Sequence, residues 1–281
     1  MTRPNVAIYG MGRFGRALAS ALPAGALLRT GGRSRPAVPD ARYRQGAEAF
    51  LQGLAPGTLV VLSVPDDALE PIANEFAALP GAGALLFVHT SGARGPEAIE
   101  PLAGAGAQTG VFHLLQSFPS EGGHELIRGS YGAVAGGPEI RAVLHTLAGA
   151  LGVTLLELSD QQRVPYHAAA VLASNALVAL LDAGAEMLQQ AGIPAEHAGR
   201  MLTPLARGTL HNAEKLGPQA ALTGPVVRGD VGTIRRHLAV LSGDARRLYI
   251  AVMLAACDTA ERSGRTPADK LAEIRALLGE G

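Results

Sequence analysis

The chain has 281 residues, and its 24 Lys and Arg balance 24 Asp and Glu to a formal net charge of zero. No overall field therefore draws it to nucleic acid or to an anionic membrane. Its single cysteine, Cys257, excludes disulfide frameworks and multi-cysteine zinc sites and is typical of a reducing compartment. We find no leader-like apolar start and no charge-free apolar run of about 18 residues, so a cytoplasmic protein without a membrane span is expected.

The first half of the chain alternates short β-rich runs with helical stretches. Strands are expected over residues 6–9, 26–29, 59–64, 84–89, 109–112 and 132–135. Helices are expected between them over residues 13–22, 46–54, 68–79 and 96–102. This alternation predicts a largely parallel sheet covered by helices on both faces.

From about residue 159 the pattern becomes helical, beginning with an Ala- and Leu-rich helix over residues 160–191. A second helix runs to Leu216 and contains Pro204, where we expect a kink or a break. Further helices begin at Asp230 and Gly243, and the last begins at Thr266-Pro-Ala-Asp269, which has capping-box spacing. The sequence thus predicts an α/β domain over residues 1–155 and an all-helical domain over residues 156–281.

Residues 6–18, VAIYGMGRFGRAL, place G-x-G-x-x-G between an apolar strand and a helix. In this context Gly10 permits a tight turn, Gly12 lets a pyrophosphate approach the backbone, and Gly15 allows the helix to pack closely on the strand. The helix start then offers free N–H groups to phosphates. We interpret the α/β domain as a Rossmann domain that binds a dinucleotide, although a structural strand-to-helix turn is the alternative.

The end of the second predicted strand decides which dinucleotide is bound. It reads Arg29-Thr-Gly-Gly-Arg33-Ser34-Arg35, and no acid precedes Asp40. Two arginines around a serine can hold a 2′-phosphate, which a carboxylate would repel. NADP(H) is therefore the expected cofactor, with a solvated basic loop as the alternative. The expected cofactor-binding residues are Gly10, Met11, Gly12, Arg13, Phe14, Gly15, Arg33, Ser34, Arg35, Val64 and Pro65.

Four further motifs carry a family resemblance: 89–92 (HTSG), 113–118 (HLLQSF), 166–175 (YHAAAVLASN) and 223–233 (TGPVVRGDVGT), the last followed by His237. With the Rossmann opening and the strand-turn 59–67 (LVVLSVPDD), the chain resembles the 6-phosphogluconate dehydrogenase-like superfamily. That superfamily includes β-hydroxyacid dehydrogenases, ketopantoate reductase and pyrroline-5-carboxylate reductase. More closely, the chain resembles a bacterial family of Rossmann-like proteins with a DUF2520 C-terminal domain. The resemblance implies an NADP-dependent oxidoreductase.

One departure from the superfamily concerns its catalytic lysine, which lies four residues before an asparagine on the long helix. The corresponding position before Asn175 is Val171 here. His167 shares a helix face with Val171 and Ser174, with Asn175 at its margin, so an imidazole could take the role of proton donor. A histidine bonded to a backbone carbonyl is the alternative.

Other candidates follow the predicted strands or open a helix. His113 and Gln116 could orient a substrate or share the acid role, and Ser91, after His89, could donate to a carboxylate or carboxamide. In the helical domain, Arg228 could bind a substrate carboxylate with His237 nearby, or pair with Asp230 as the N-cap. The predicted catalytic residues are His167, His113, Asn175 and Ser91, and the predicted substrate-binding residues are Arg228, Asp230, Ser174 and Gln116.

We therefore expect NADPH-dependent reduction of a small carboxylated carbonyl compound, such as a ketopantoate-like 2-oxo acid. The alternatives are a cyclic imine reductase, a non-catalytic NADP(H)-binding regulator, and an enzyme that uses the deazaflavin F420 with NADP. No metal is expected, because His, Cys and carboxylates lack zinc-ligand spacing. The apolar surface of the long Ala-rich helix predicts a homodimer through the helical domain.

Overall fold

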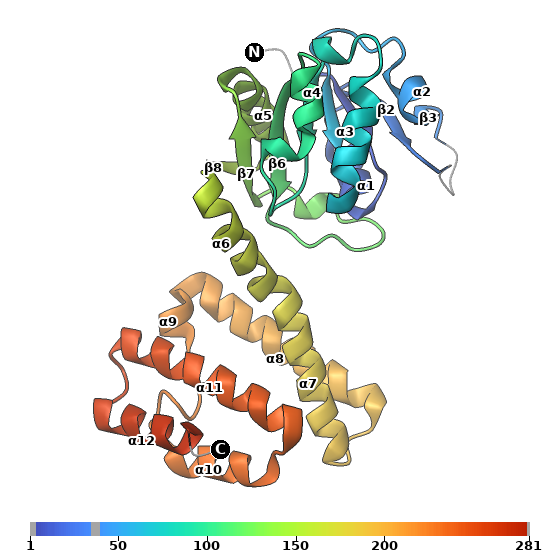
Figure 1. The fold of residues 1–281 in the computed structure, drawn as a ribbon. Helices are drawn as coiled ribbons and strands as arrows, with labels where there is room; N and C mark the ends of the chain where they lie inside the picture. The colour runs from blue at the N-terminus through green and yellow to red at the C-terminus, as the bar shows by residue number, and fades with distance from the viewer. Residues whose placement is uncertain (1–3, 35–39, 280–281) are drawn as a thin grey trace. The chain divides into compact units, whose positions relative to one another are not determined.

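The computed structural model describes residues 4–34 and 40–279, which form two compact units (Figure 1). The first unit covers Met1–Ser174 and the second covers Asn175–Gly281. The change from strands to helices comes earlier, between the last strand at Glu157 and the helix that begins at Asp160. The division into units falls inside a helical segment, and the domain boundary predicted after residue 155 lies within the last strand of the sheet, Thr154–Glu157.

The first unit contains an eight-stranded sheet in the order β3-β2-β1-β4-β5-β6-β7-β8. All neighbouring pairs are parallel except β6 and β7, which are antiparallel. The strands are β1 (Val6–Tyr9), β2 (Leu27–Gly32), β3 (Tyr43–Gln45), β4 (Leu59–Leu62), β5 (Leu86–His89), β6 (Gln108–Leu114), β7 (Tyr131–Gly136) and β8 (Thr154–Glu157).

Helices cover both faces of this sheet, because its central strands carry apolar side chains on both sides. In β1, Val6 and Ile8 pack in the cluster that includes α1 (Arg13–Ala21) and α5 (Pro138–Leu151). Ala7 and Tyr9 pack in the opposite cluster, which contains α2 (Ala47–Leu51), α3 (Leu69–Ala77), η3 (Pro96–Ile99) and α4 (Glu100–Gly104). The predicted α/β Rossmann fold with a helical C-terminal part is confirmed.

In the first unit, the elements that were not expected from the sequence include α5, β3 and β8. Helix α5 carried a readable signal, since Ile140, Leu144, Leu147 and Leu151 recur at helical spacing and are buried. The strands β3 and β8 are short and close the two edges of the sheet. Edge strands are paired on one side only, so their sequences show no buried apolar run.

The second unit is helical and has its own core. Its helices are α7 (Leu177–Gln190), α8 (Ala195–Leu216), α9 (Pro218–Ala221), α10 (Val231–Val240), α11 (Gly243–Ser263) and α12 (Ala268–Gly279). The core gathers buried residues of α10, α11 and α12, including Ile234, Cys257 and Ile274. Of the kink or break predicted at Pro204, the break is wrong, because α8 continues through it; one missing N–H leaves the other backbone bonds of this long helix in place.

One helical segment joins the end of the sheet to the second unit. Helix α6 (Asp160–Val171) begins at a capping box formed by Ser159 and Gln162, and a π-helical turn (Leu172–Ala176) separates it from α7. Within the described part of the chain, the 31-residue segment Asp160–Gln190 alone is long and apolar enough to cross a membrane, by length and composition. This finding corrects the sequence analysis, which missed that residues 164–181 contain no Asp, Glu, Lys or Arg.

Candidate cofactor and catalytic site

The turn between β1 and α1 has a geometry that only glycine satisfies at two of its three positions. Gly10 has φ +103°, and a Cβ there would lie 2.1 Å from the backbone oxygen of Ser63. A Cβ on Gly15 would lie 2.1 Å from the carbonyl oxygen of Gly10. Gly12 differs, because nothing lies within 4 Å of its Cβ position. The first and third glycines therefore close the turn, and the second keeps space open in front of it.

Helix α1 begins without a side-chain cap. Gly12 is its N-cap residue, no side chain accepts a hydrogen bond from the first turn, and that turn contains no acidic residue. The first N–H groups of a helix lack partners within the helix, and its dipole makes this end positive. This arrangement fits the phosphates of a dinucleotide.

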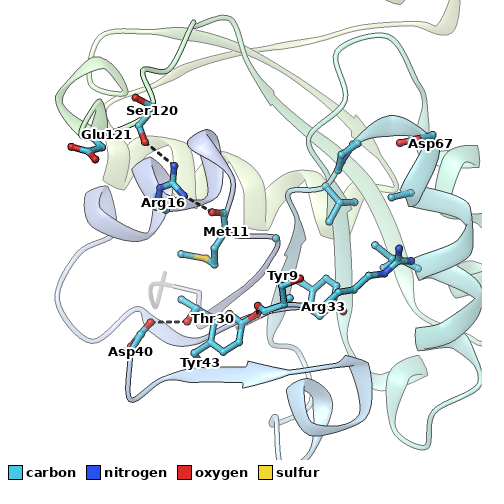
Figure 2. A pocket seen from close by; sticks show the side chains of 17 residues that line it. Tyr9, Met11, Arg16, Thr30, Arg33, Asp40, Tyr43, Asp67, Ser120 and Glu121 are labelled. Atoms are coloured by element: carbon cyan, nitrogen blue, oxygen red, sulfur yellow. Dashed lines mark hydrogen bonds between the residues drawn. The ribbon is translucent and has the colours of Figure 1, made fainter. Parts of the chain in front are cut away.

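A cavity of about 1180 Å³ opens beside this turn (Figure 2). Six of the predicted cofactor-binding residues line it: Gly10, Met11, Arg33, Ser34, Val64 and Pro65. The sequence analysis missed other residues that line it: Tyr9, Arg16, Thr30, Gly32, Asp40, Tyr43, Asp67, Ala68, Ile72, Ser120 and Glu121. These come from strand ends, from helices α1 and α3 and from loops far apart in the chain, and their order in the sequence gives no sign of a shared cavity.

Four of the predicted cofactor-binding residues lie at the turn but do not line the cavity: Gly12, Arg13, Phe14 and Gly15. The ring of Phe14 packs against Phe118, with centroids 5.3 Å apart. Arg13 is exposed at the start of α1. Arg35 lies outside the described residues, so the predicted pair of arginines is represented in the structure by Arg33 alone.

Basic and acidic groups both line the cavity. Arg33 and Ser34 follow β2, and the hydroxyl of Tyr43 donates a hydrogen bond to the Ser34 carbonyl. Asp40 lines the cavity as well, and its carboxylate accepts a hydrogen bond from Thr30 Oγ1 at 2.7 Å. That hydrogen bond lowers the pKa of Asp40, so the carboxylate is charged at neutral pH. A carboxylate therefore lines the cavity, although the sequence has no acidic residue between the second strand and Asp40.

Two further side chains fix the walls of the cavity (Figure 2). Arg16 of α1 donates to the Met11 carbonyl at 2.9 Å and to the Ser120 carbonyl at 2.7 Å, and thereby ties the glycine turn to the loop after β6. Tyr9 is 1% exposed, and its buried hydroxyl has no hydrogen-bond partner. Burial raises the pKa of Tyr9, so its hydroxyl keeps its proton. Such an orphaned donor is available to a molecule in the cavity.

The segment after β4 connects this cavity to a second polar region. Pro65 and Asp67 line the cavity, whereas the carboxylate of Asp66 accepts a hydrogen bond from Ser91 Oγ at 2.8 Å. Ser91 Oγ also accepts from the backbone N–H groups of Ala93 and Arg94. Ser91, a predicted catalytic residue, therefore donates its hydroxyl hydrogen bond to Asp66 and holds the loop after β5 through the N–H groups of Ala93 and Arg94.

The second region brings together the two predicted catalytic histidines. His113 comes from β6 and His167 from α6, and their ring centroids are 6.3 Å apart. A Cβ on Gly92 would lie 2.7 Å from His167 Nδ1 and 2.8 Å from His113 Nε2, so the loop after β5 packs against both rings. His113 Nδ1 lies 3.0 Å from the hydroxyl of Tyr166, which the sequence analysis did not select. We call His113, Tyr166 and His167 the imidazole cluster.

Burial sets the protonation of His113 and Tyr166 in this cluster. Burial, together with the neighbouring His167, lowers the pKa of His113 to about 4. Burial also raises the pKa of Tyr166 to about 12 and lowers that of His89, whose Nε2 lies 2.8 Å from the Gly95 carbonyl. At neutral pH His113 and His89 are thus uncharged and Tyr166 keeps its proton. Nδ1 of His167 is buried without a hydrogen-bond partner.

The remaining predicted residues lie in several places. Gln116 donates to the Leu126 carbonyl at 3.3 Å and accepts from the Ser117 N–H. Ser174 is in the π-helical turn, where its hydroxyl donates to the Ala170 carbonyl, and Asn175 follows it as the first residue of the second unit. No group of three or more His, Cys, Asp or Glu side chains among the described residues could hold a metal.

Arg228 and Asp230 lie in the second unit, just before α10. Asp230 is the N-cap of that helix and accepts from the N–H and the hydroxyl of Thr233. Those two hydrogen bonds lower its pKa. His237 lies on α10, where its Nδ1 is 2.7 Å from the hydroxyl of Tyr249. The contacts of Asp230 are therefore those of a helix N-cap. The structure gives no ion pair between Arg228 and Asp230.

Comparison with protein families identifies both parts of the chain. A Rossmann-like domain matches residues 1–114, and DUF2520, a domain of unknown function, matches residues 130–256. The Rossmann-like and DUF2520 domains predicted from the sequence motifs are therefore confirmed. No curated protein matches the chain significantly.

Comparison with solved structures finds the same fold along nearly the whole chain. A Thermotoga maritima protein shares 22% identity with a TM-score of 0.70, covering 92% of this chain and 100% of its own. A Bacteroides fragilis protein, provisionally described as an NADP oxidoreductase, shares 22% identity with a TM-score of 0.68, covering 92% and 98%. Plasmodium falciparum pyrroline carboxylate reductase, solved with NADP bound, shares 12% identity with a TM-score of 0.60, covering 99% of each chain.

Proposed function

We propose that this chain, which combines a Rossmann-like domain with a DUF2520 domain, is an NADPH-dependent oxidoreductase that reduces a small carboxylated carbonyl compound such as a 2-oxo acid. The proposal rests on two features that are connected within the first unit. A glycine turn with an uncapped helix start borders a large cavity, and residues 64–67 run from that cavity to the loop beside the imidazole cluster.

In this proposal the cavity binds the cofactor. The turn at Gly10, Gly12 and Gly15 holds the pyrophosphate at the start of α1, and Arg33 with Ser34 holds the 2′-phosphate. The orphaned hydroxyl of Tyr9 supplies a further donor within the cavity. The similarity in fold to a reductase solved with NADP bound supports this assignment.

The imidazole cluster accounts for proton transfer. When bound, NADPH supplies the hydride, and the protein must supply a proton to the oxygen of the reduced carbonyl. His113 is uncharged at neutral pH because its pKa is about 4, so it orients Tyr166 rather than acting as a cationic acid. His167, with its unpartnered Nδ1, takes the role of proton donor in place of the lysine that Val171 replaces.

A cyclic imine is the second candidate substrate class. The similarity in fold to a pyrroline carboxylate reductase favours it. A carbonyl and an imine make different demands on the proton donor, since the imine nitrogen is itself basic and can arrive protonated. Replacement of His167 should therefore impair reduction of a 2-oxo acid far more than reduction of a cyclic imine.

The proposal is tested first by cofactor binding. NADPH and NADH are titrated by cofactor fluorescence against the wild-type protein, Arg33→Ala and Gly12→Val. We expect NADPH to bind more tightly than NADH, Arg33→Ala to remove that preference, and Gly12→Val to weaken both while the protein stays folded. Absence of NADPH binding would refute the proposal.

Catalysis is tested next with a panel of 2-oxo acids and cyclic imines, by following NADPH oxidation. With a 2-oxo acid, His167→Ala should lower turnover by about 100-fold or more, the range for loss of a general acid. His197→Ala, on the exposed surface of α8, is the control and should retain activity. If NADPH binds yet no compound is reduced above background, the chain is a cofactor-binding regulator.

A further inference from the structure

A buried arginine that the proposed reaction has not used lies beside the imidazole cluster. Arg163 of α6 is 3% exposed, and its Nε and Nη2 are buried without hydrogen-bond partners. The nearest carboxylate is Asp160, at 3.6 Å from Nη2, which is too far for a hydrogen bond. The side chain of Asp160 is 89% exposed, so water weakens this ion pair further.

A buried guanidinium without hydrogen-bond partners destabilises the folded protein unless another group binds it. Arginine does not lose its proton in a protein, so burial cannot neutralise it as it neutralises a lysine or a histidine. Buried polar groups are nearly always paired, and each exception calls for a reason, such as a ligand. Two adjacent N–H groups of one planar guanidinium are spaced to bind the two oxygens of a carboxylate.

The position of Arg163 on its helix relates it to the catalytic candidates. Tyr166 and His167 follow it by three and four residues, so the three side chains share one face of α6. On that face Tyr166 contacts His113, and His167 packs against Gly92. The charge of Arg163 also contributes to the lowered pKa of His89, at the end of β5.

We propose that Arg163 binds the carboxylate of the substrate and holds the neighbouring carbonyl carbon at the imidazole cluster. This inference rests on the proposed reductase function and assigns to Arg163 the role that the sequence analysis gave to Arg228. It narrows the substrate class to small acids with a carboxylate next to the reducible carbon, as in a 2-oxo acid or a cyclic imine carboxylate. Neutral ketones and aldehydes bind poorly to such a site.

Anion binding without cofactor tests the inference. Oxamate, which resembles a 2-oxo acid but is not reduced, is titrated while the histidine C2–H resonances are followed by NMR, and neutral oxamide is titrated in parallel. Oxamate should shift the resonances of His89, His113 and His167, and oxamide should not. Arg163→Met should weaken oxamate binding by about ten-fold or more, and Arg163→Lys should retain part of it, since hydrogen bonds to charged groups account for changes of this size.

Thermal unfolding separates this role from a structural one. Arg163→Met replaces an unpaired buried charge with an apolar chain, so the midpoint should stay the same or rise while oxamate binding is lost. Arg207→Met, at an exposed site on α8, is the control for removal of a positive charge. Should Arg163→Met fail to fold, Arg163→Lys decides the outcome, because it should bind oxamate more weakly than the wild type does.

Two results would overturn the inference: no oxamate-dependent shift in the wild-type protein, or equal oxamate binding by the wild type and the Arg163 variants. If Arg228→Met rather than an Arg163 variant lost oxamate binding, the anchor would lie in the second unit. Because these titrations contain no cofactor, they test only which arginine binds the carboxylate. The NADPH titrations decide the proposed function independently.

Discussion

Acidification should destabilise the first unit through His113. Burial lowers the pKa of this imidazole to about 4 in the folded protein, whereas the unfolded chain has a histidine pKa of about 6.5. Between these two values the unfolded state binds a proton that the folded state rejects. The contribution of His113 to stability is therefore complete above pH 6.5 and decreases as the pH falls toward 4.

The size of the effect follows from the difference between the two pKa values. Each pH unit in this window costs about 1.4 kcal/mol, so His113 should lower the free energy of unfolding by about 2 kcal/mol at pH 5 and about 3 kcal/mol at pH 4. His167 and Asp66 act on His113 in opposite directions, since His167 lowers its pKa and Asp66 raises it. His89 has a lowered pKa as well and adds acid sensitivity of the same sign.

Urea unfolding followed by circular dichroism at pH 7, 6 and 5 measures this contribution. His113→Gln can keep a hydrogen bond to Tyr166 but cannot be protonated, so it should lose about 2 kcal/mol less stability than the wild type between pH 7 and pH 5. His89 is present in both proteins and cancels in the comparison. His197→Gln should behave as the wild type does. Equal acid sensitivity of the wild type and His113→Gln would refute the reasoning.

Three further predictions concern the turn, the cofactor cavity and the surface. Gly10→Ala should lower the free energy of unfolding in urea by about 2 kcal/mol or more, because its Cβ would lie 2.1 Å from the Ser63 backbone. Gly12→Ala, whose Cβ meets nothing, should change it by less than about 0.5 kcal/mol. Equal losses of stability in the two variants would contradict this prediction. In fluorescence titrations, Asp40→Asn should raise the affinity for NADPH about three-fold and leave the affinity for NADH unchanged, because it removes a negative charge from the cavity. Weaker binding of NADH by this variant would instead mean that Asp40 binds the ribose. If the protein forms the homodimer predicted through its helical domain, Leu205→Glu should make it a monomer by light scattering, since Leu205 on α8 is 67% exposed. A monomeric wild type would contradict this prediction.

The sequence by itself determined the features that local patterns encode. The buried strand β1, the glycine turn and the start of α1 are specified within thirteen consecutive residues, 6–18, and the structure has them as predicted. The change from strands to helices after residue 157 was also readable, because the apolar spacing changes there from the strand period to the helix period.

Only the tertiary structure decided which distant side chains meet. Asp40 reaches the cavity because Thr30 binds its carboxylate, and Arg16 reaches Ser120 across 104 residues of sequence. Ser91 looked like a free donor until the fold placed Asp66 beside it. Arg163 gave no signal at all, since an arginine near the start of a helix is ordinarily solvated. Burial is set by packing between elements far apart in the chain, and the composition of a single segment does not encode it.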